Sequence, residues 1–113
     1  MVCRVGDYQF SLPVAAVLEV CTETTLVRVP GVAPPVEGVA NIRGTLVTIV
    51  RAADLLGVGT AWSGPSPWLV VLRARGGRVG LGVEAVLELA AADASVARLD
   101  LDGALDSVFG RSA

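Results

Sequence analysis

The side chains that most often carry enzymatic chemistry are scarce in this sequence. It has no histidine, which excludes a Ser-His or Cys-His nucleophile pair and a histidine metal site. It has no lysine to reach a phosphate, and Gly80-Leu81-Gly82 lacks the third glycine and the following helix of a phosphate-binding loop. Cys3 and Cys21 are too few and too far apart for a disulfide scaffold or a zinc site, so we expect small buried apolar residues there. An enzyme that uses either thiol is the weakest hypothesis.

Two further groups of residues have an ordinary structural interpretation. Asp100, Asp102 and Asp106 cluster near one another, and the first two suit the start of a helix, whose dipole favours negative charge. An acid/base dyad is the less favoured alternative. Trp62 and Trp68 flank a segment rich in glycine, serine and proline, and we expect them to cover an edge of the core rather than bind a ligand. The sequence therefore predicts no enzymatic activity, no metal ion and no cofactor.

One pair of polar residues stands out because it interrupts an apolar stretch. Residues 37–50 predict two apolar-rich strands joined at Arg43-Gly44, with Asn41 and Arg43 beside the turn. The glycine permits a tight turn, and a guanidinium offers five donors to carboxylates or carbonyls. These polar groups either satisfy the backbone of the turn or form a presented binding feature, and the two interpretations are compatible.

The elements around this turn predict a mostly β protein. Residues 2–5 and 8–12 form a hairpin around Gly6-Asp7, a glycine-first loop typical of a type II′ turn. Pro13 can begin a helix, and an apolar stripe with helical spacing follows it. A second hairpin turns at Gly76-Gly77, and alternate glycines at 80 and 82 indicate bulges or close backbone approach. Further strands are expected at 26–29, 84–89 and 99–101, and short helices at 13–21, 52–56 and 102–109.

Composition limits the classes of protein that fit. The 113 residues suit one domain, 1–113, in which the segment 58–67 crosses between two sub-barrels. With 53% hydrophobic residues disorder is not expected, yet the longest apolar runs fall far short of the ~20 residues of a membrane span. No signal-peptide pattern opens the chain, so we expect a cytoplasmic protein without membrane insertion. Nine basic residues against eleven acidic ones give a formal charge of −2, which opposes nucleic-acid binding.

The stretch 36–47, Val-Glu-Gly-Val-Ala-Asn-Ile-Arg-Gly-Thr-Leu-Val, resembles a signature of CheW-type coupling proteins of bacterial chemosensory systems. That family shows the pattern G-V-x-N-[IL]-R-G-x-[IV] in this place. The preceding residues 29–35 resemble its proline loop, and Leu55-Leu56-Gly57 the helix end after the motif. Residues 79–88 resemble its second signature, G-L-x-V-D-x-V, with Glu84 in place of the usual aspartate. The resemblance runs from Val2 to about Leu89 and returns near Leu99.

This resemblance implies a pair of interlocked small SH3-like barrels with two or three short helices and no catalysis. It also implies docking between the tips of methyl-accepting chemoreceptors and a CheA-type histidine kinase. The family's Asn-Arg-Gly region lies near the groove between the barrels where the receptor binds. Carried over by position, the candidate receptor contacts are Val39, Asn41, Arg43 and Gly44. An apolar groove would receive a receptor helix by its apolar face.

Two departures from the family pattern bear on the partners. Arg51 stands where the family usually has an aspartate after a proline, which reverses a charge and marks an altered partner surface. Only residues 90–98 lie where the family has further strands, so we expect one barrel to be incomplete. Because the family holds its kinase through barrel edges, kinase coupling is expected to be weakened or lost. An unfinished edge could pair with another CheW-like protein or with a second copy.

The leading hypothesis is thus a non-enzymatic adaptor that binds the cytoplasmic tip of a chemoreceptor, a short divergent member of the sort found in Frz-type pathways. The alternative is an ordinary coupler of receptor to kinase whose shorter segment is harmless. A more distant alternative is an SH3-like nucleic-acid-binding module, which the net acidity and the sparse aromatic residues oppose.

Overall fold

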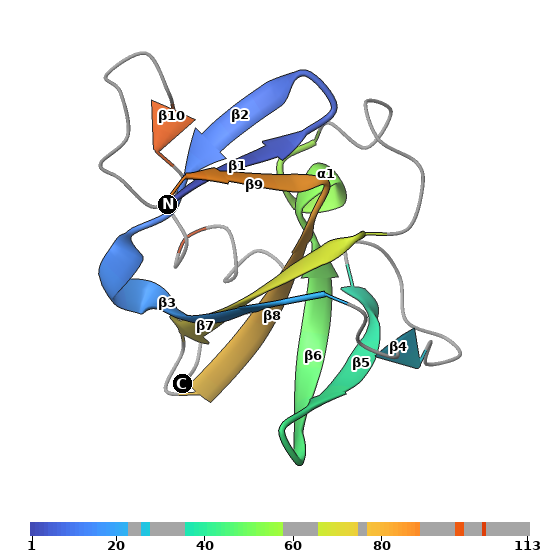
Figure 1. The fold of residues 1–113 in the computed structure, drawn as a ribbon. Helices are drawn as coiled ribbons and strands as arrows, with labels where there is room; N and C mark the ends of the chain where they lie inside the picture. The colour runs from blue at the N-terminus through green and yellow to red at the C-terminus, as the bar shows by residue number, and fades with distance from the viewer. Residues whose placement is uncertain are drawn as a thin grey trace.

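The structure is a computed structural model that describes residues 1–22, 26–27, 36–57, 66–74, 77–88, 97–98 and 103. In chain order its elements are β1 (Val2–Val5), β2 (Tyr8–Ser11), the 3-10 turn η1 (Val14–Ala16), β3 (Val17–Cys21), β4 (Leu26–Val27), β5 (Val36–Ile42), β6 (Thr45–Arg51), α1 (Ala52–Leu55), β7 (Trp68–Ala74), β8 (Gly77–Val83), β9 (Ala85–Glu88) and β10 (Ala97–Arg98). They form a four-stranded sheet, β10-β2-β1-β9, and a six-stranded sheet, β3-β7-β8-β6-β5-β4 (Figure 1). The mostly β prediction is confirmed.

Strands β7 and β8 serve two hydrophobic cores, because alternate side chains of a strand point to opposite faces of its sheet. Val70, Leu72 and Leu81 face the larger core, together with apolar residues of the four-stranded sheet and Val50. Leu69 and Val71 face the smaller core, which also contains Ala40, Ile42, Val47 and Ile49. Two small barrels that share β7 and β8 are the interlocked arrangement that the sequence predicted.

The six-stranded sheet is strongly curled around the smaller core. In a flat sheet β3 and β6 would lie three strand spacings apart, or about 14 Å. Instead, Arg43 at the β5–β6 turn reaches Glu19 on β3, with 2.9 Å between Arg43 Nε and Glu19 Oε2. The β5–β6 turn therefore lies near β3, one edge strand of the sheet.

Glycines of β8 make this curl possible on its inner face. A Cβ atom added at Gly80 would overlap Cδ1 of Ile49, and one at Gly82 would lie 2.7 Å from Cβ of Ser66 and 3.0 Å from Oε2 of Glu37. Both glycines are buried. The predicted bulges and close backbone approach at these positions are wrong, because neither ladder of β8 has a register shift there and side chains, not backbone, fill the space beside both glycines.

The predicted hairpins form, with one shift of register. Val5 pairs with Tyr8 around Gly6, whose φ of 57° suits the expected glycine-first turn. In the second hairpin Ala74 pairs with Gly77, so Gly77 belongs to β8 and not to the turn predicted at Gly76-Gly77. The turn itself lies outside the described residues.

The helix predicted over 13–21 is wrong beyond its first turn. Only η1 follows Pro13, and the next five residues form β3, which pairs antiparallel with β7. The apolar spacing fits a helix, but Val14, Val17 and Val20 are β-branched and favour an extended backbone. Pairing with β7 also satisfies the backbone groups of one strand edge, a tertiary effect that the local pattern does not contain.

The remaining predicted elements have mixed outcomes. Helix α1 forms and ends at Gly57, whose φ of 74° is typical of a C-terminal glycine. Strand β9 forms after a bend at Glu84, as expected. A short strand, β10, forms at residues 97–98, where no strand was predicted, and pairs parallel with β2. The predicted strand 99–101, the C-terminal helix with its aspartates, Trp62 and most of the crossing 58–67 lie outside the described residues, so the sub-barrel crossing and the incomplete barrel stay predictions.

Candidate functional site

The β5–β6 turn has the backbone of a type I′ hairpin turn. Arg43 and Gly44 have φ values of 51° and 81°, and Ile42 pairs with Thr45 on either side. The side-chain oxygen Oδ1 of Asn41 accepts a hydrogen bond of 2.9 Å from the backbone N–H of Gly44. Asn41 therefore satisfies a backbone donor of the turn, which is the first of the two interpretations given above. Its side chain remains exposed at the tip of the hairpin.

Arg43 is paired within the chain and yet largely exposed. Its Nε donates a hydrogen bond of 2.9 Å to Oε2 of Glu19, while 83% of the Arg43 side chain is exposed. The hydrogen bond from Arg43 is the main cause that lowers the pKa of the Glu19 carboxyl, and the same bond raises the pKa of Arg43. The thiol of Cys21 also approaches Oε2 of Glu19, at 3.6 Å. A guanidinium carries five donors, so this pairing leaves Arg43 able to meet a partner.

The outer surface of β4, β5 and β6 carries exposed apolar side chains, and we call it the outer hairpin face. It consists of Val27, Val39, Asn41 and Leu46, which the register places on one side: Val27 opposite Val39, and Asn41 opposite Leu46. Val27 is 61% exposed and Leu46 is 74% exposed, whereas Val39 is half-buried. Such apolar exposure beside polar turn residues suits contact with a partner.

The structure therefore brings the four predicted receptor contacts together on one hairpin, and it adds residues that sequence reasoning missed. Val27 and Leu46 belong to the same face. Leu46 precedes Val47, whose side chain is buried in the smaller core, so strand alternation points Leu46 to the opposite side of the sheet. Glu19 gave no signal in the sequence, since it lies in β3, 24 residues from Arg43, in a segment that was expected to be helical.

Arg51 does not belong to this surface. It is the last residue of β6, at the opposite end of the strand from the turn, and it precedes α1. It pairs with Gly82 across the parallel ladder to β8, and its side chain is half-buried, with Nε shielded from solvent. An altered partner surface at Arg51 would be separate from the outer hairpin face.

No described group of three or more His, Cys, Asp or Glu residues is placed to hold a metal ion. None of the helices in the described part of the chain is long and apolar enough to span a membrane.

Comparison with known proteins identifies the family to which the chain belongs. The model of the CheW-like domain matches residues 1–102. Among solved structures, the chain is similar to the scaffolding protein TtCheW from Thermoanaerobacter tengcongensis, with a TM-score of 0.73 and 24% sequence identity. That match covers 82% of this chain and 64% of the TtCheW chain, so the present chain spans less than two thirds of its structural neighbour. No curated protein sequence matches the chain.

Proposed function

Because the chain belongs to the CheW-like domain family, we propose that it is a non-enzymatic adaptor of a bacterial chemosensory array that binds the cytoplasmic tip of a methyl-accepting chemoreceptor. Membership of this family agrees with the expectation that the protein is not an enzyme. The observation that carries the proposal is the outer hairpin face, where an exposed Leu46 lies opposite Asn41 at the end of the family signature.

The chemistry of this face suits an amphipathic helix of the receptor. Val27, Val39 and Leu46 offer apolar contact, and burying a leucine or valine side chain contributes about 1.5–3 kcal/mol. Asn41 and Arg43 at the turn offer hydrogen-bonding groups at the rim. This combination of an apolar centre and a polar edge is the usual composition of a helix-binding surface.

The apolar half of the proposal is tested by Leu46→Ala in a binding titration with a soluble cytoplasmic fragment of the receptor. Losing about three buried carbon groups should cost about 2 kcal/mol, or roughly 30-fold in Kd. The matched control is Leu87→Ala on β9, since Leu87 is also exposed, at 46%, but lies in the other sheet. Equal effects of the two changes, or no binding by the wild-type chain, would refute the receptor proposal.

The role of Arg43 needs a charge swap, because Arg43→Glu alone would place two carboxylates side by side with Glu19. The double variant Arg43→Glu/Glu19→Arg restores an ion pair of the opposite orientation. We expect receptor binding to stay weak in the double variant, since the cation has moved from the turn to β3. Recovery of wild-type binding would show that Arg43 acts only within the fold.

We further propose that kinase coupling is weakened or lost, because only residues 90–98 follow the second signature where the family has further strands. A pull-down with a CheA-type kinase fragment tests this separately from receptor binding. Full binding of the kinase fragment by the chain would instead favour the alternative, an ordinary protein that couples receptor to kinase.

A further inference from the structure

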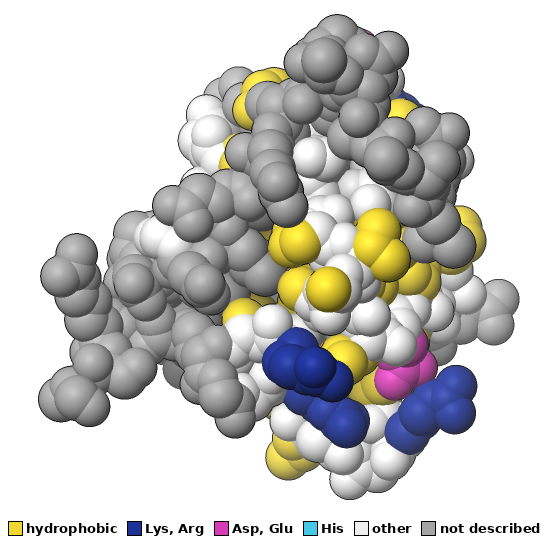
Figure 2. Space-filling model, turned by 90° about the vertical axis from the view of Figure 1, so that its left-hand side faces the viewer, with side chains coloured by type: hydrophobic (Ala, Val, Ile, Leu, Met, Phe, Trp, Pro, Cys, Tyr) yellow, Lys and Arg dark blue, Asp and Glu magenta, His cyan; other side chains and the backbone are white. Residues whose placement is uncertain are grey.

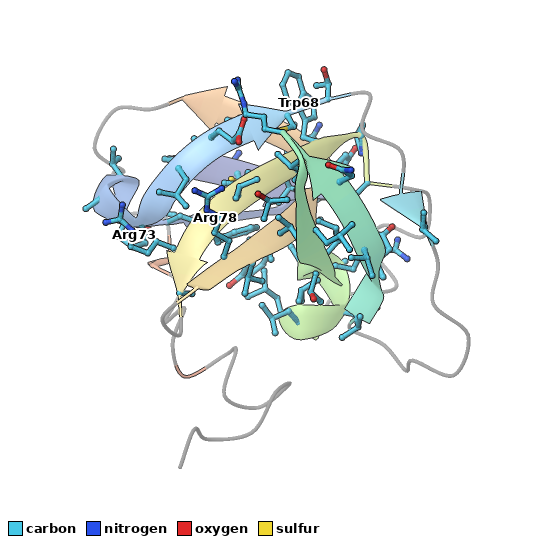
Figure 3. All side chains as sticks on the ribbon, turned by 90° about the horizontal axis from the view of Figure 1, so that it is seen from below. Trp68, Arg73 and Arg78 are labelled. Atoms are coloured by element: carbon cyan, nitrogen blue, oxygen red, sulfur yellow. The ribbon has the colours of Figure 1, made fainter. Side chains whose placement is uncertain are left out.

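A pair of arginines lies at one end of the two shared strands. Arg73 on β7 is directly opposite Arg78 on β8, and both side chains are exposed. By strand alternation they lie on the side that faces the smaller core, in line with Leu69 and Val71. Figure 3 shows the two arginines near each other, away from Trp68 at the start of β7. They lie near the end of β7 and the start of β8.

Like charges directly opposite each other destabilise a sheet, so this pair costs stability unless a partner offsets its charge. Neither guanidinium forms an ion pair within the part of the chain that the structure describes. The nearest compensation is Glu19, whose carboxylate feels the charge of Arg78 but is already hydrogen-bonded to Arg43. We call Glu19, Arg43, Arg73 and Arg78 the barrel-mouth cluster.

The barrel-mouth cluster is locally basic on a chain whose formal charge is −2. Three guanidiniums against one carboxylate leave two positive charges in excess. Arg43, Arg73 and Arg78 are all exposed, and Figure 2 shows basic side chains beside an acidic one on the face that it draws. The excess charge therefore faces solvent, where an anionic partner could reach it.

We propose that the barrel-mouth cluster is a docking surface for an acidic helical segment of a partner protein. The Cβ atoms of paired residues on neighbouring antiparallel strands lie about 4.5–5.5 Å apart, and the Cβ atoms of helix residues i and i+4 lie about 5–6 Å apart. Arg73 and Arg78 can thus each hold one carboxylate in a bidentate pair. Removal of their mutual repulsion on binding adds to the attraction.

The cluster fits a protein partner better than a nucleic acid. The carboxylate of Glu19 lies among the arginines and would repel a continuous phosphate backbone, whereas a helix with two carboxylates can avoid it. No aromatic side chain belongs to the cluster, so it offers no platform for stacking bases. Docking of an acidic helix goes beyond the proposed receptor binding, because it centres on Arg73 and Arg78, which lie outside the outer hairpin face; Arg43 is the one residue that the two proposals share.

The test uses a fluorescein-labelled alanine-based helical peptide with two glutamates at positions i and i+4, and a second peptide with glutamines instead. We expect anisotropy titrations to show binding of the glutamate peptide that weakens as salt rises, and at least tenfold weaker binding of the glutamine peptide. Equal binding of the two peptides would overturn the proposal. Tighter binding of a single-stranded oligonucleotide would overturn it in favour of a nucleic-acid site.

Single substitutions locate the peptide on the surface. Arg78→Gln should weaken binding several-fold, while Gln9→Glu, which lowers the net charge equally but lies on β2 in the other sheet, should leave it unchanged. Glu19→Gln should strengthen binding, because it removes the one carboxylate of the cluster. Arg78→Lys should give an intermediate affinity, since it keeps the charge and loses the bidentate fork. Equal effects of Arg78→Gln and Gln9→Glu would overturn the proposal.

Two control variants distinguish peptide docking at the barrel mouth from receptor binding and from a role of the arginines in folding. Leu46→Ala should leave peptide binding unchanged, so failure of the receptor proposal and failure of this one give different results. Thermal unfolding of Arg73→Gln/Arg78→Gln should occur no lower than in the wild type, because the repulsion between the two like charges is gone. A large loss of stability together with unchanged peptide binding by the folded variant would mean that the arginines act only in the fold.

Discussion

Gly80→Ala perturbs the packing of β8 against Ile49 of β6 in the six-stranded sheet. The added Cβ would overlap Cδ1 of Ile49, while its next contacts, Cγ1 of Val47 at 3.5 Å and Cγ1 of Ile49 at 3.7 Å, are ordinary packing distances. Ile49 is fully buried in the smaller core, so its terminal methyl group has little room to move. Forcing one extra carbon into a packed core costs about 1–3 kcal/mol. We expect Gly80→Ala to lower the free energy of unfolding by this amount.

Because Gly80→Ala acts through Cδ1 of Ile49, a second substitution at Ile49 should recover part of the lost stability. Ile49→Val removes the Cδ1 atom that the new Cβ would meet, and alone it should cost about 0.5–1.5 kcal/mol. The double variant should therefore be more stable than the sum of the two single effects predicts, by about 1 kcal/mol or more. Urea unfolding followed by circular dichroism measures all three variants. Gly77→Ala is the matched control on the same strand, because a Cβ there meets nothing within 4 Å. Additive effects, or equal losses at Gly80 and Gly77, would refute the role of Gly80 in the curl.

Two further predictions concern titration and reactivity. The pKa of Glu19 lies below its ordinary value of 4.5, mainly because Arg43 donates a hydrogen bond to it. The stabilisation by this ion pair is thus complete above pH 4.5 and is lost as the pH falls through the lowered folded-state pKa. Carboxyl NMR should show that Arg43→Gln returns the pKa of Glu19 toward 4.5, and an unchanged value would contradict the pairing. Burial raises the pKa of the Cys3 thiol to about 11, so at pH 8 a thiol reagent should modify the half-buried Cys21 first. Equally fast modification of both cysteines in the folded protein would show that Cys3 is not enclosed.

The parts of the fold that sequence reasoning predicted correctly depend on local chemistry. The turn at Arg43-Gly44 requires positive φ angles, which a glycine signals directly. Helix α1 ends at Gly57 for a similar reason. The β-branched and apolar residues that make up most of β6 likewise favour a strand. Such features are determined within a few residues, so the sequence alone contains them.

The parts that were missed depend on contacts between distant segments. Val17–Cys21 forms a strand because β7 is available to pair with it, and no spacing within the segment reveals that neighbour. Pairing of Arg43 with Glu19 follows from the curl of the sheet, which in turn requires the glycines of β8. The opposition of Arg73 and Arg78 depends on a register in which Gly77, predicted as a turn residue, pairs with Ala74. A shift of one residue changes which side chains meet across a sheet, so register must be known before a surface can be described.

Register also explains how one hairpin can take part in two surfaces. Leu46 and Asn41 pair on the outer hairpin face, whereas Arg43 at the turn reaches back to Glu19 in the barrel-mouth cluster. An exposed ion pair of this kind contributes little to folding, because solvent screens it. If Arg43→Gln weakens partner binding about tenfold or more while leaving unfolding unchanged, the loss must come from contact with the partner. The affinities of Arg43→Gln and of Leu46→Ala are then compared for the receptor fragment and for the acidic peptide. A partner whose binding Leu46→Ala weakens contacts the outer hairpin face, and a partner whose binding only Arg43→Gln weakens contacts the barrel-mouth cluster.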